Sequence, residues 1–415
     1  MSPPTTSFPK DQLRVLLAEN VHVRAAEVFA DHGYRVERLK RPLSRDDLIE
    51  AASGVHVLGV RSKTALPGPV INSMPRLLAA GCFCIGTNHV DLSTARARGV
   101  PVFNSPFSNT RSVAELTIAE CVALSRRLGD RSNEMHAGVW RKSSAGSFEV
   151  RGKTLGIIGY GHIGSQVSVL AEAMGMRVLY FDAVPKLPLG NARAVSSLSE
   201  LLQASDIVSL HVPQTEATQK LIGRDELSAM KAGASLINNA RGNVVDVAGL
   251  AEALRSGHIG GAALDVFPHE PGSSEEPFES ELRGLDNVIL TPHIGGSTEE
   301  AQRAIAEDVA IKLVRFLDIG STTGAVNMPQ VELPAQDSGV GARPHRILHM
   351  HKNVPGVLSA LHASISARGV NVTGEYLRTD EELGYVVLDV GPTDTVGLAA
   401  ALRSIPETVR VRTLF

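Results

Sequence analysis

Residues 154–182 read TLGIIGYGHIGSQVSVLAEAMGMRVLYFD, a strand, a glycine-rich turn, a helix and a second strand. Gly159, Gly161 and Gly164 have the spacing G-x-G-x-x-G, which lets the backbone approach a pyrophosphate at the N-terminus of the following helix. Asp182 ends the second strand, where a carboxylate accepts hydrogen bonds from ribose hydroxyls and repels a 2′-phosphate. The stretch therefore predicts a dinucleotide site that favours NAD over NADP.

Short apolar runs alternate with helical segments on both sides of this stretch, as is typical of parallel sheets in α/β domains. A first series begins at Arg14 and contains RVLLAE, GVHVLGVRS, PRLLAAGC and VPVFNSP. A second series begins at Lys153 and contains TLGIIGY, RVLYFD, IVSLHV, ASLINNA, GAALDVF and NVILTPH. Six parallel strands with crossovers match a complete dinucleotide-binding sheet, so we expect two doubly wound α/β domains.

The pattern changes after this second series. Residues 295–317, GGSTEEAQRAIAEDVAIKLVRFL, predict a long amphipathic helix that begins at a Ser/Thr cap. Residues 331–343 lack periodicity and are rich in Gly, Pro and Ser, which indicates a linker. Residues 344–415 predict a small ferredoxin-like βαββαβ module.

Length and composition restrict the remaining possibilities. A chain of 415 residues is too long for one core, and its net charge of -3 gives no reason to expect nucleic-acid or membrane binding. The first ten residues lack a basic start followed by an apolar run, so we expect no secretory signal and a cytoplasmic location. The three cysteines lack the spacing of a disulfide framework, Cys82 and Cys84 are expected to be buried thiols, and the 14 histidines show no metal-ligand spacing.

Three candidate catalytic side chains follow three successive strands of the second series. Arg241 follows ASLINNA, Glu270 follows GAALDVFPH, and His293 ends NVILTPH, so all three are expected at the carboxyl ends of parallel strands. A neutral His can accept the proton of a 2-hydroxyl group, and a neighbouring carboxylate orients the ring and raises its pKa. A guanidinium can bind the carboxylate of a hydroxy acid in bidentate fashion. Each residue alone is ordinary, but together they indicate a hydroxy-acid dehydrogenase.

The stretches GIIGYGHIG, INNARGNVVD, ALDVFPHEP and TPHIGGST resemble motifs of the D-isomer-specific 2-hydroxyacid dehydrogenases. The resemblance implies a substrate domain of residues 11–106 and 295–330, with an NAD-binding Rossmann domain of residues 107–294 between them. It also implies cofactor contacts, beyond the three glycines, from His162, Ile163, Asp182, Asn239, Ala240, Arg241, Asp265, His293, Ile294, Gly295 and Gly296.

Three further stretches, VRSKTAL, FSNTRSVAE and GCFCIGTNHVD, resemble family members that act on 3-phosphoglycerate. The resemblance implies substrate contacts from Arg61, Ser62, Asn109 and Gln302. Lys40 and Lys142 either add positive potential near them or are ordinary surface lysines. The chain departs from the family's RSRT at Lys63, which keeps the charge but loses the guanidinium fork.

The stretch HKNVPGVLSAL in the C-terminal module resembles an ACT domain, a small amino-acid-sensing unit. The resemblance implies that two such domains pair in a homotetramer and bind L-serine through His351, Asn353 and Asn371. An ACT-like module that only dimerises is the alternative. A Gly-Gly hinge expected before this domain is replaced by residues 339–341, Gly-Val-Gly.

These resemblances together imply NAD-dependent oxidation of 3-phospho-D-glycerate to 3-phosphohydroxypyruvate, the first step of the phosphorylated route to L-serine, with feedback inhibition by L-serine. The nearest alternative is a dehydrogenase of the same family that acts on glycerate, lactate or 2-hydroxyglutarate. Alternatives from another class are an NAD-sensing binding protein on the same fold and an amino-acid sensor with a degenerate dehydrogenase half.

Overall fold

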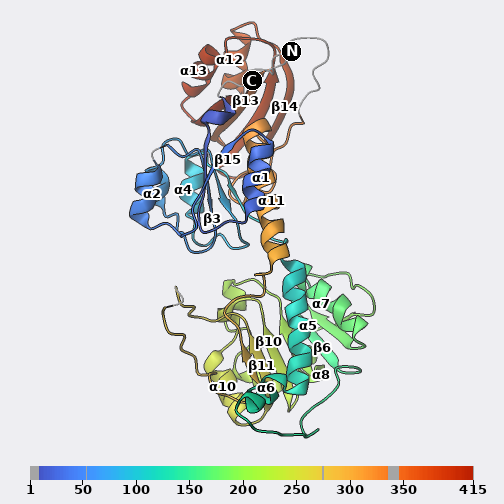
Figure 1. The fold of residues 1–415 in the computed structure, drawn as a ribbon. Coiled ribbons are helices and arrows are strands. Elements are labelled where there is room, and N and C mark those ends of the chain that lie inside the picture. The colour runs from blue at the N-terminus through green and yellow to red at the C-terminus, as the bar shows by residue number, and fades with distance from the viewer. Residues whose placement is uncertain (1–8, 53, 273–274, 335–344, 415) are drawn as a thin grey trace. The chain divides into compact units, whose positions relative to one another are not determined.

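The computed structural model describes residues 9–52, 54–272, 275–334 and 345–414 (Figure 1). The chain divides into two compact units, one of residues 1–108 with 302–415 and the other of residues 109–301. The family resemblance predicted that the domains change after residues 106 and 294, whereas the units of the structure change after residues 108 and 301. In the structure the C-terminal module belongs to the same unit as the first sheet. The proposed linker of residues 331–343 lies mostly outside the described residues, including the Gly-Val-Gly segment.

The first unit contains a five-stranded parallel sheet in the order β2-β1-β3-β4-β5. Its strands are β1 (Arg14–Leu17), β2 (Arg35–Arg38), β3 (Val57–Val60), β4 (Ala79–Cys82) and β5 (Val102–Phe103). Its helices are η1 (Lys10–Gln12), α1 (Val23–Asp31), α2 (Arg45–Ala52), α3 (Gly68–Asn72), α4 (Leu92–Ala97) and, from residue 302 onward, α11 (Glu299–Ile319).

Both faces of this sheet are covered, as the fully buried strands β3 and β4 require. On one face Val15 and Leu17 pack with Phe29 of α1 and Leu313 of α11. On the other face Leu16 and Leu58 join a separate cluster with the helices that follow β2 and β3. Figure 1 shows α1 and α11 on one side of the sheet and α2 and α4 on the other. The carboxyl ends of the strands are therefore left for functional loops.

The C-terminal module is a four-stranded antiparallel sheet in the order β14-β15-β13-β16, with two helices on one face. Its elements are β13 (His345–Lys352), α12 (Val357–Ser366), β14 (Val372–Thr379), β15 (Leu383–Val390), α13 (Thr395–Arg403) and β16 (Thr408–Leu414). Ile347 and Leu388 pack with the helices, whereas Leu348 and Tyr385 join the core that contains α11. The βαββαβ prediction is confirmed.

The second unit contains a seven-stranded parallel sheet in the order β12-β11-β10-β9-β6-β7-β8. Its strands are β6 (Thr154–Ile158), β7 (Arg177–Phe181), β8 (Arg193–Ala194), β9 (Ile207–Leu210), β10 (Ala234–Asn238), β11 (Ile259–Leu264) and β12 (Val288–Leu290). Its helices are α5 (Thr110–Arg126), α6 (Leu128–His136), α7 (His162–Ala173), α8 (Leu198–Ala204), η2 (Glu216–Thr218), α9 (Arg224–Ala229), η3 (Gly242–Val244) and α10 (Val247–Arg255).

The sequence pattern missed one strand of this sheet. β8 has two residues, both exposed, and pairs with the outer edge of β7. A strand this short cannot carry an apolar alternation. The six expected strands are present and form the dinucleotide-binding sheet, with β12 at one edge, and β8 adds a seventh strand at the other edge.

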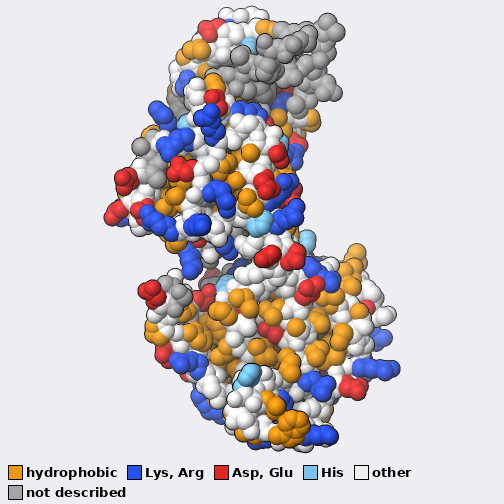
Figure 2. Space-filling view, in the orientation of Figure 1, with side chains coloured by type: hydrophobic (Ala, Val, Ile, Leu, Met, Phe, Trp, Pro, Cys, Tyr) orange, Lys and Arg blue, Asp and Glu red, His pale blue; other side chains and the backbone are white. Residues whose placement is uncertain are grey.

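Apolar side chains are widely exposed on the second unit (Figure 2). Along α6 and the segment after it, the exposed hydrophobic residues are Leu128, Met135, Val139, Trp140 and Phe148. An exposed apolar surface of this kind is typical of a protein–protein contact.

Cys82 and Cys121 are buried and Cys84 is half-buried, and none is in a disulfide. Burial raises the pKa of all three thiols, that of Cys84 to about 12, so they remain protonated. In the described part of the chain, no helix is long and apolar enough to cross a membrane. The same residues include no group of three or more His, Cys, Asp or Glu side chains arranged to hold a metal ion.

Candidate active site

The glycine-rich turn joins β6 to α7. Gly159 has φ 91°, and a Cβ there would lie 2.6 Å from the carbonyl oxygen of His211. A Cβ on Gly164 would collide with the carbonyl oxygen of Gly159, whereas a Cβ on Gly161 would project into open space. The first glycine is thus required for the turn and the third for close packing, and the second leaves room for a ligand. These are the three roles that a pyrophosphate-binding turn assigns to its glycines.

Asp182 follows β7 directly and lies beside this turn. Its carboxylate accepts hydrogen bonds from the backbone N–H of Tyr160 at 2.8 Å and of Val184 at 2.9 Å. These bonds fix the orientation of the carboxylate and leave lone pairs for further donors. The arrangement fits the adenosine ribose hydroxyls of NAD.

His293 and Glu270 form the central contact of the site. The Nδ1 atom of His293 lies 2.9 Å from Oε2 of Glu270, and Oε1 of Glu270 accepts a hydrogen bond from the N–H of Phe267 at 3.2 Å. A carboxylate partner assigns the proton to Nδ1 and leaves the lone pair of the neutral ring on Nε2. The free nitrogen of His293 can therefore act as a base.

The charges around this pair shift both pKa values. The hydrogen bond to Glu270 raises the pKa of His293, and the negative charges of Glu270 and Asp265 add to it, whereas burial and Arg241 oppose it. Burial alone would raise the pKa of Glu270, but the hydrogen bond and charge of His293, the Phe267 N–H and Arg241 together lower it. Each partner thus favours the charged form of the other.

Arg241 stands directly before η3, and its charge acts on both His293 and Glu270. Its position is fixed locally, because its carbonyl oxygen accepts a hydrogen bond from Nδ2 of Asn238 at 3.0 Å and its guanidinium donates to the carbonyl of Ala240 at 2.6 Å. The structure therefore brings the three predicted catalytic residues together at the carboxyl ends of β10, β11 and β12.

Asp265, a predicted cofactor contact, holds the loop that carries His293. One carboxylate oxygen accepts from the Thr291 hydroxyl at 2.6 Å and the Ile294 N–H at 2.8 Å, and the other from the Gly295 N–H at 2.7 Å. His293 itself has φ 56°, a conformation that non-glycine residues adopt rarely and that surrounding contacts must maintain. Asp265 supplies such contacts on both sides of His293.

Asn239, another predicted cofactor contact, is held from behind by α5. Its amide nitrogen donates to the Thr117 hydroxyl at 3.1 Å and to Glu120 at 2.6 Å, and its buried Oδ1 has no partner among the described residues. Burial raises the pKa of Glu120 to about 7, although the Asn239 amide opposes the shift. Sequence reasoning missed both α5 residues, since a Glu within a helix usually lies on its solvent face and no local pattern marks this one as buried.

The predicted substrate residues are divided between the units. Asn109 is buried and directly precedes α5 in the second unit, whereas Arg61, Ser62 and Gln302 belong to the first. Lys40 and Lys142 also fall in the first and second unit, respectively.

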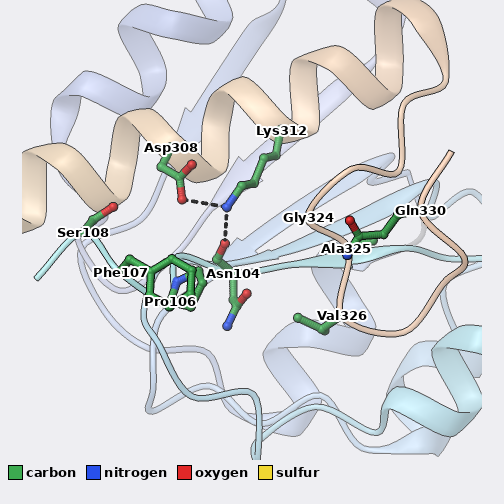
Figure 3. A pocket seen from close by; sticks show the side chains of 10 residues that line it. All are labelled: Asn104, Pro106, Phe107, Ser108, Asp308, Lys312, Gly324, Ala325, Val326 and Gln330. Atoms are coloured by element: carbon green, nitrogen blue, oxygen red, sulfur yellow. Dashed lines mark hydrogen bonds and ion pairs between the residues drawn. The ribbon is translucent and has the colours of Figure 1, made fainter. Parts of the chain in front are cut away.

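A cavity of about 720 Å³ in the first unit contains none of these predicted residues (Figure 3). Within it Lys312 donates to the carbonyl of Asn104 at 2.9 Å and to the Asp308 carboxylate at 2.7 Å. Because this ammonium charge is already balanced, the described residues that line the cavity offer no available cation for a phosphorylated substrate.

The predicted serine ligands do not meet within one chain. His351 is buried, with Nδ1 3.3 Å from Nδ1 of His349, whereas Asn353 is exposed and donates to the carbonyl of Asp380 at 2.6 Å. Asn371 precedes β14, whose first residues are level with the start of β13, so it lies at the opposite end of the sheet from Asn353. The separation along the strands is roughly 26 Å, about eight residues at 3.3 Å each.

Comparison with known proteins agrees with this geometry. Residues 118–295 match the family "D-isomer specific 2-hydroxyacid dehydrogenase, NAD binding domain", and residues 347–411 match "AHAS small subunit-like ACT domain". The second unit is therefore the NAD-binding half of a D-isomer-specific 2-hydroxyacid dehydrogenase, and the chain is an NAD-dependent oxidoreductase. The predicted fold class and cofactor are confirmed.

Full-length relatives narrow the class further. The chain is 51% identical over 412 residues to D-3-phosphoglycerate dehydrogenase of Dictyostelium discoideum, covering 99% of this chain and 100% of that one. It is 50% identical to the enzyme of that name from Escherichia coli K12, with 99% of each chain covered. The chain belongs to the D-3-phosphoglycerate dehydrogenase family.

Solved structures share the dehydrogenase part. The TT0316 protein of Thermus thermophilus is 36% identical with a TM-score of 0.67, over 74% of this chain and 97% of that one. D-lactate dehydrogenase of Aquifex aeolicus, solved with NAD and lactic acid, is 29% identical with a TM-score of 0.65, over 76% and 100% of the two chains.

Proposed function

We propose that this chain oxidises 3-phospho-D-glycerate to 3-phosphohydroxypyruvate with NAD, the first step of the phosphorylated route to L-serine. The observation that carries the proposal is the His293–Glu270 hydrogen bond of 2.9 Å beside the Arg241 charge, within a chain of this family.

The three side chains divide the reaction between them. Nε2 of His293 removes the proton of the 2-hydroxyl group, and Glu270 stabilises the imidazolium that forms. Arg241 binds the substrate carboxylate and thereby orients the carbon that loses hydride. NAD, when bound, supplies the hydride acceptor, and Gly159, Gly161, Gly164 and Asp182 would hold its pyrophosphate and adenosine ribose.

The phosphate end of the substrate is assigned to Arg61, Ser62, Asn109 and Gln302. Lys63 would contribute charge without bidentate geometry. The experiment is to compare NADH formation from 3-phosphoglycerate, glycerate, lactate and 2-hydroxyglutarate as kcat/KM. The proposal requires 3-phosphoglycerate to be preferred and the preference to fall in Arg61→Ala. A higher kcat/KM for an unphosphorylated acid would identify the protein as another dehydrogenase of the same class.

We further propose that L-serine inhibits the enzyme by binding where two C-terminal modules pair. Support comes from Asn353 and Asn371, which lie at opposite ends of one sheet and can meet only across a second copy. β14 is an edge strand of that sheet, and a two-fold contact along such an edge brings opposite strand ends together. The buried ring of His351, two residues before Asn353, would contribute a further polar group to the site.

We propose that the protein is a cytoplasmic homotetramer. A tetramer with two-fold symmetry needs two different contacts. The exposed apolar residues along α6 and after it supply one candidate, and the β14 edge supplies the other. Three unpaired cysteines fit a reducing compartment. Mass measurement in solution tests the assembly, and a monomer at working concentration would contradict it.

A further inference from the structure

Glu19 is a buried carboxylate residue at the carboxyl end of β1, and it is 7% exposed. One oxygen accepts hydrogen bonds from the backbone N–H of Arg61 at 3.1 Å and of Thr64 at 2.6 Å. The other accepts from the N–H of Lys63 at 3.0 Å. Three of the four N–H groups in the segment 61–64 therefore converge on one side chain that follows a different strand.

The backbone that carries Glu19 is itself unusual. Glu19 and Asn20 have φ values of 59° and 52°, so two consecutive non-glycine residues adopt the left-handed conformation. The turn is held by hydrogen bonds from the Glu19 N–H to the carbonyl of Arg41 at 3.1 Å and from the Asn20 N–H to that of Leu39 at 3.0 Å. Conformations of this kind persist where surrounding contacts maintain them, and they concentrate at functional sites.

The charge of Glu19 is balanced by backbone rather than by a cation. Among residues 9–52, 54–272, 275–334 and 345–414, no Lys or Arg forms an ion pair with it. Glu19 binds the backbone of Arg61 and leaves the guanidinium of Arg61 for another anion. A ring of N–H donors around a carboxylate fixes the loop by charge-assisted hydrogen bonds, which are shorter and stronger than neutral ones.

We propose that Glu19 is a positioning residue for substrate binding: it fixes residues 61–64 so that Arg61 and Ser62 face the anionic substrate. The inference rests on the proposed role of Arg61 and Ser62. Glu19 is assigned no contact with the substrate, since its carboxylate is buried and bonded to the loop. It acts on the affinity for 3-phosphoglycerate and not on the hydride-transfer step.

Glu19→Gln is the informative variant because it keeps the shape of the side chain. An amide has one acceptor oxygen, so at least one of the three N–H groups would face an NH₂ donor instead. We expect the KM for 3-phosphoglycerate to rise about tenfold, with kcat within about twofold and the KM for NAD unchanged. Glu19→Asp keeps both oxygens and the charge, and it should recover part of the loss.

Asp206→Asn is the matched control. Like Glu19, Asp206 accepts a hydrogen bond from a backbone N–H, that of Thr154 at 2.8 Å, and it also forms an ion pair with Lys231 at 3.2 Å. It differs in lying in the other unit, at the amino ends of the strands. The Asp206→Asn substitution should lower the thermal stability of the protein without changing the KM for 3-phosphoglycerate.

A double-mutant cycle separates this inference from the proposed function. Arg61→Ala alone tests whether Arg61 binds substrate: an unchanged KM would refute that role. If Glu19 acts through Arg61 and Ser62, Glu19→Gln should raise the KM less in Arg61→Ala than in the unmodified protein. In a protein that carries both Arg61→Ala and Ser62→Ala it should change the KM by less than about twofold, since coupled residues are not additive. A full, multiplicative effect in the double variant would overturn the positioning role and leave that of Arg61 intact.

Hydrogen exchange of the unmodified protein supplies a measurement that needs no variant. The amides of Arg61, Lys63 and Thr64 should exchange slowly in the absence of substrate, because the carboxylate holds them. Rapid exchange of all three, or a Glu19→Gln protein that lowers kcat and leaves the KM unchanged, would overturn the inference.

Discussion

His293 and Glu270 follow different strands, β12 and β11, yet their side chains are joined by a hydrogen bond of 2.9 Å. Because the two strands are parallel neighbours, their carboxyl ends lie side by side and a base can be placed against its orienting carboxylate. The contact raises the pKa of His293, so the base stays charged to higher pH than a free imidazole would.

The first prediction concerns the pH dependence of oxidation. The reaction requires neutral His293, so kcat/KM should increase as the pH rises through the elevated pKa of this residue. Glu270→Gln removes the charge that raises that pKa, and the acid limb of the profile should move to lower pH. His293→Ala should lower kcat roughly 100-fold or more without weakening NAD binding. An acid limb that stays in place in Glu270→Gln would rule out Glu270 as the partner of the base.

The second prediction concerns cofactor choice. The Asp182 carboxylate is fixed by the N–H groups of Tyr160 and Val184 and would repel the 2′-phosphate of NADP. NAD should be strongly preferred. Asp182→Ala should lower the ratio of kcat/KM with NAD to kcat/KM with NADP about tenfold or more, because it removes that repulsion. Equal efficiency with both cofactors in the unmodified enzyme would contradict the assignment.

The third prediction concerns L-serine. Asn353→Ala should raise the serine concentration for half-inhibition about tenfold, because a polar partner of the ligand is lost, while kcat without serine stays the same. Asn191→Ala, an exposed asparagine of the NAD-binding unit, is the control. Calorimetry that detects no serine binding to the intact protein would reduce the C-terminal module to an assembly device.

The fourth prediction concerns Glu120. Its pKa is raised from the usual 4.5 to about 7, so between these values the folded protein keeps a proton that the unfolded chain releases. The free energy of unfolding should therefore fall as the pH rises through this window, by roughly 3 kcal/mol in total. Glu120→Gln should abolish this dependence. Glu115 is an exposed acid of the same helix, so Glu115→Gln should leave the pH dependence unchanged. If the free energy of unfolding of Glu120→Gln fell with pH as in the unmodified protein, the burial of Glu120 would not be its cause.

The sequence was sufficient wherever a functional residue is marked by a local pattern, such as a glycine spacing or the end of an apolar strand. The glycine spacing predicted the turn after β6, and the polar residues after successive strands predicted that Arg241, Glu270 and His293 would meet. It was insufficient where one side chain serves a distant segment. Glu19 bonds to amides 42 to 45 residues away, and Glu120 to an amide 119 residues away, so no local pattern marks either. β8 was missed because two residues are too few to show a period.

The placement of Asn353 and Asn371 at opposite ends of one sheet has a thermodynamic consequence. Under the proposed pairing, the ligand site is completed by a second copy and exists in the paired state alone, so ligand binding and association would strengthen each other by the same factor. A two-fold pair contains two such sites, related by the symmetry axis. Dilution that separates the modules should then abolish sensitivity to the proposed effector before it abolishes oxidation, so that the concentration of the enzyme would help to determine its own inhibition.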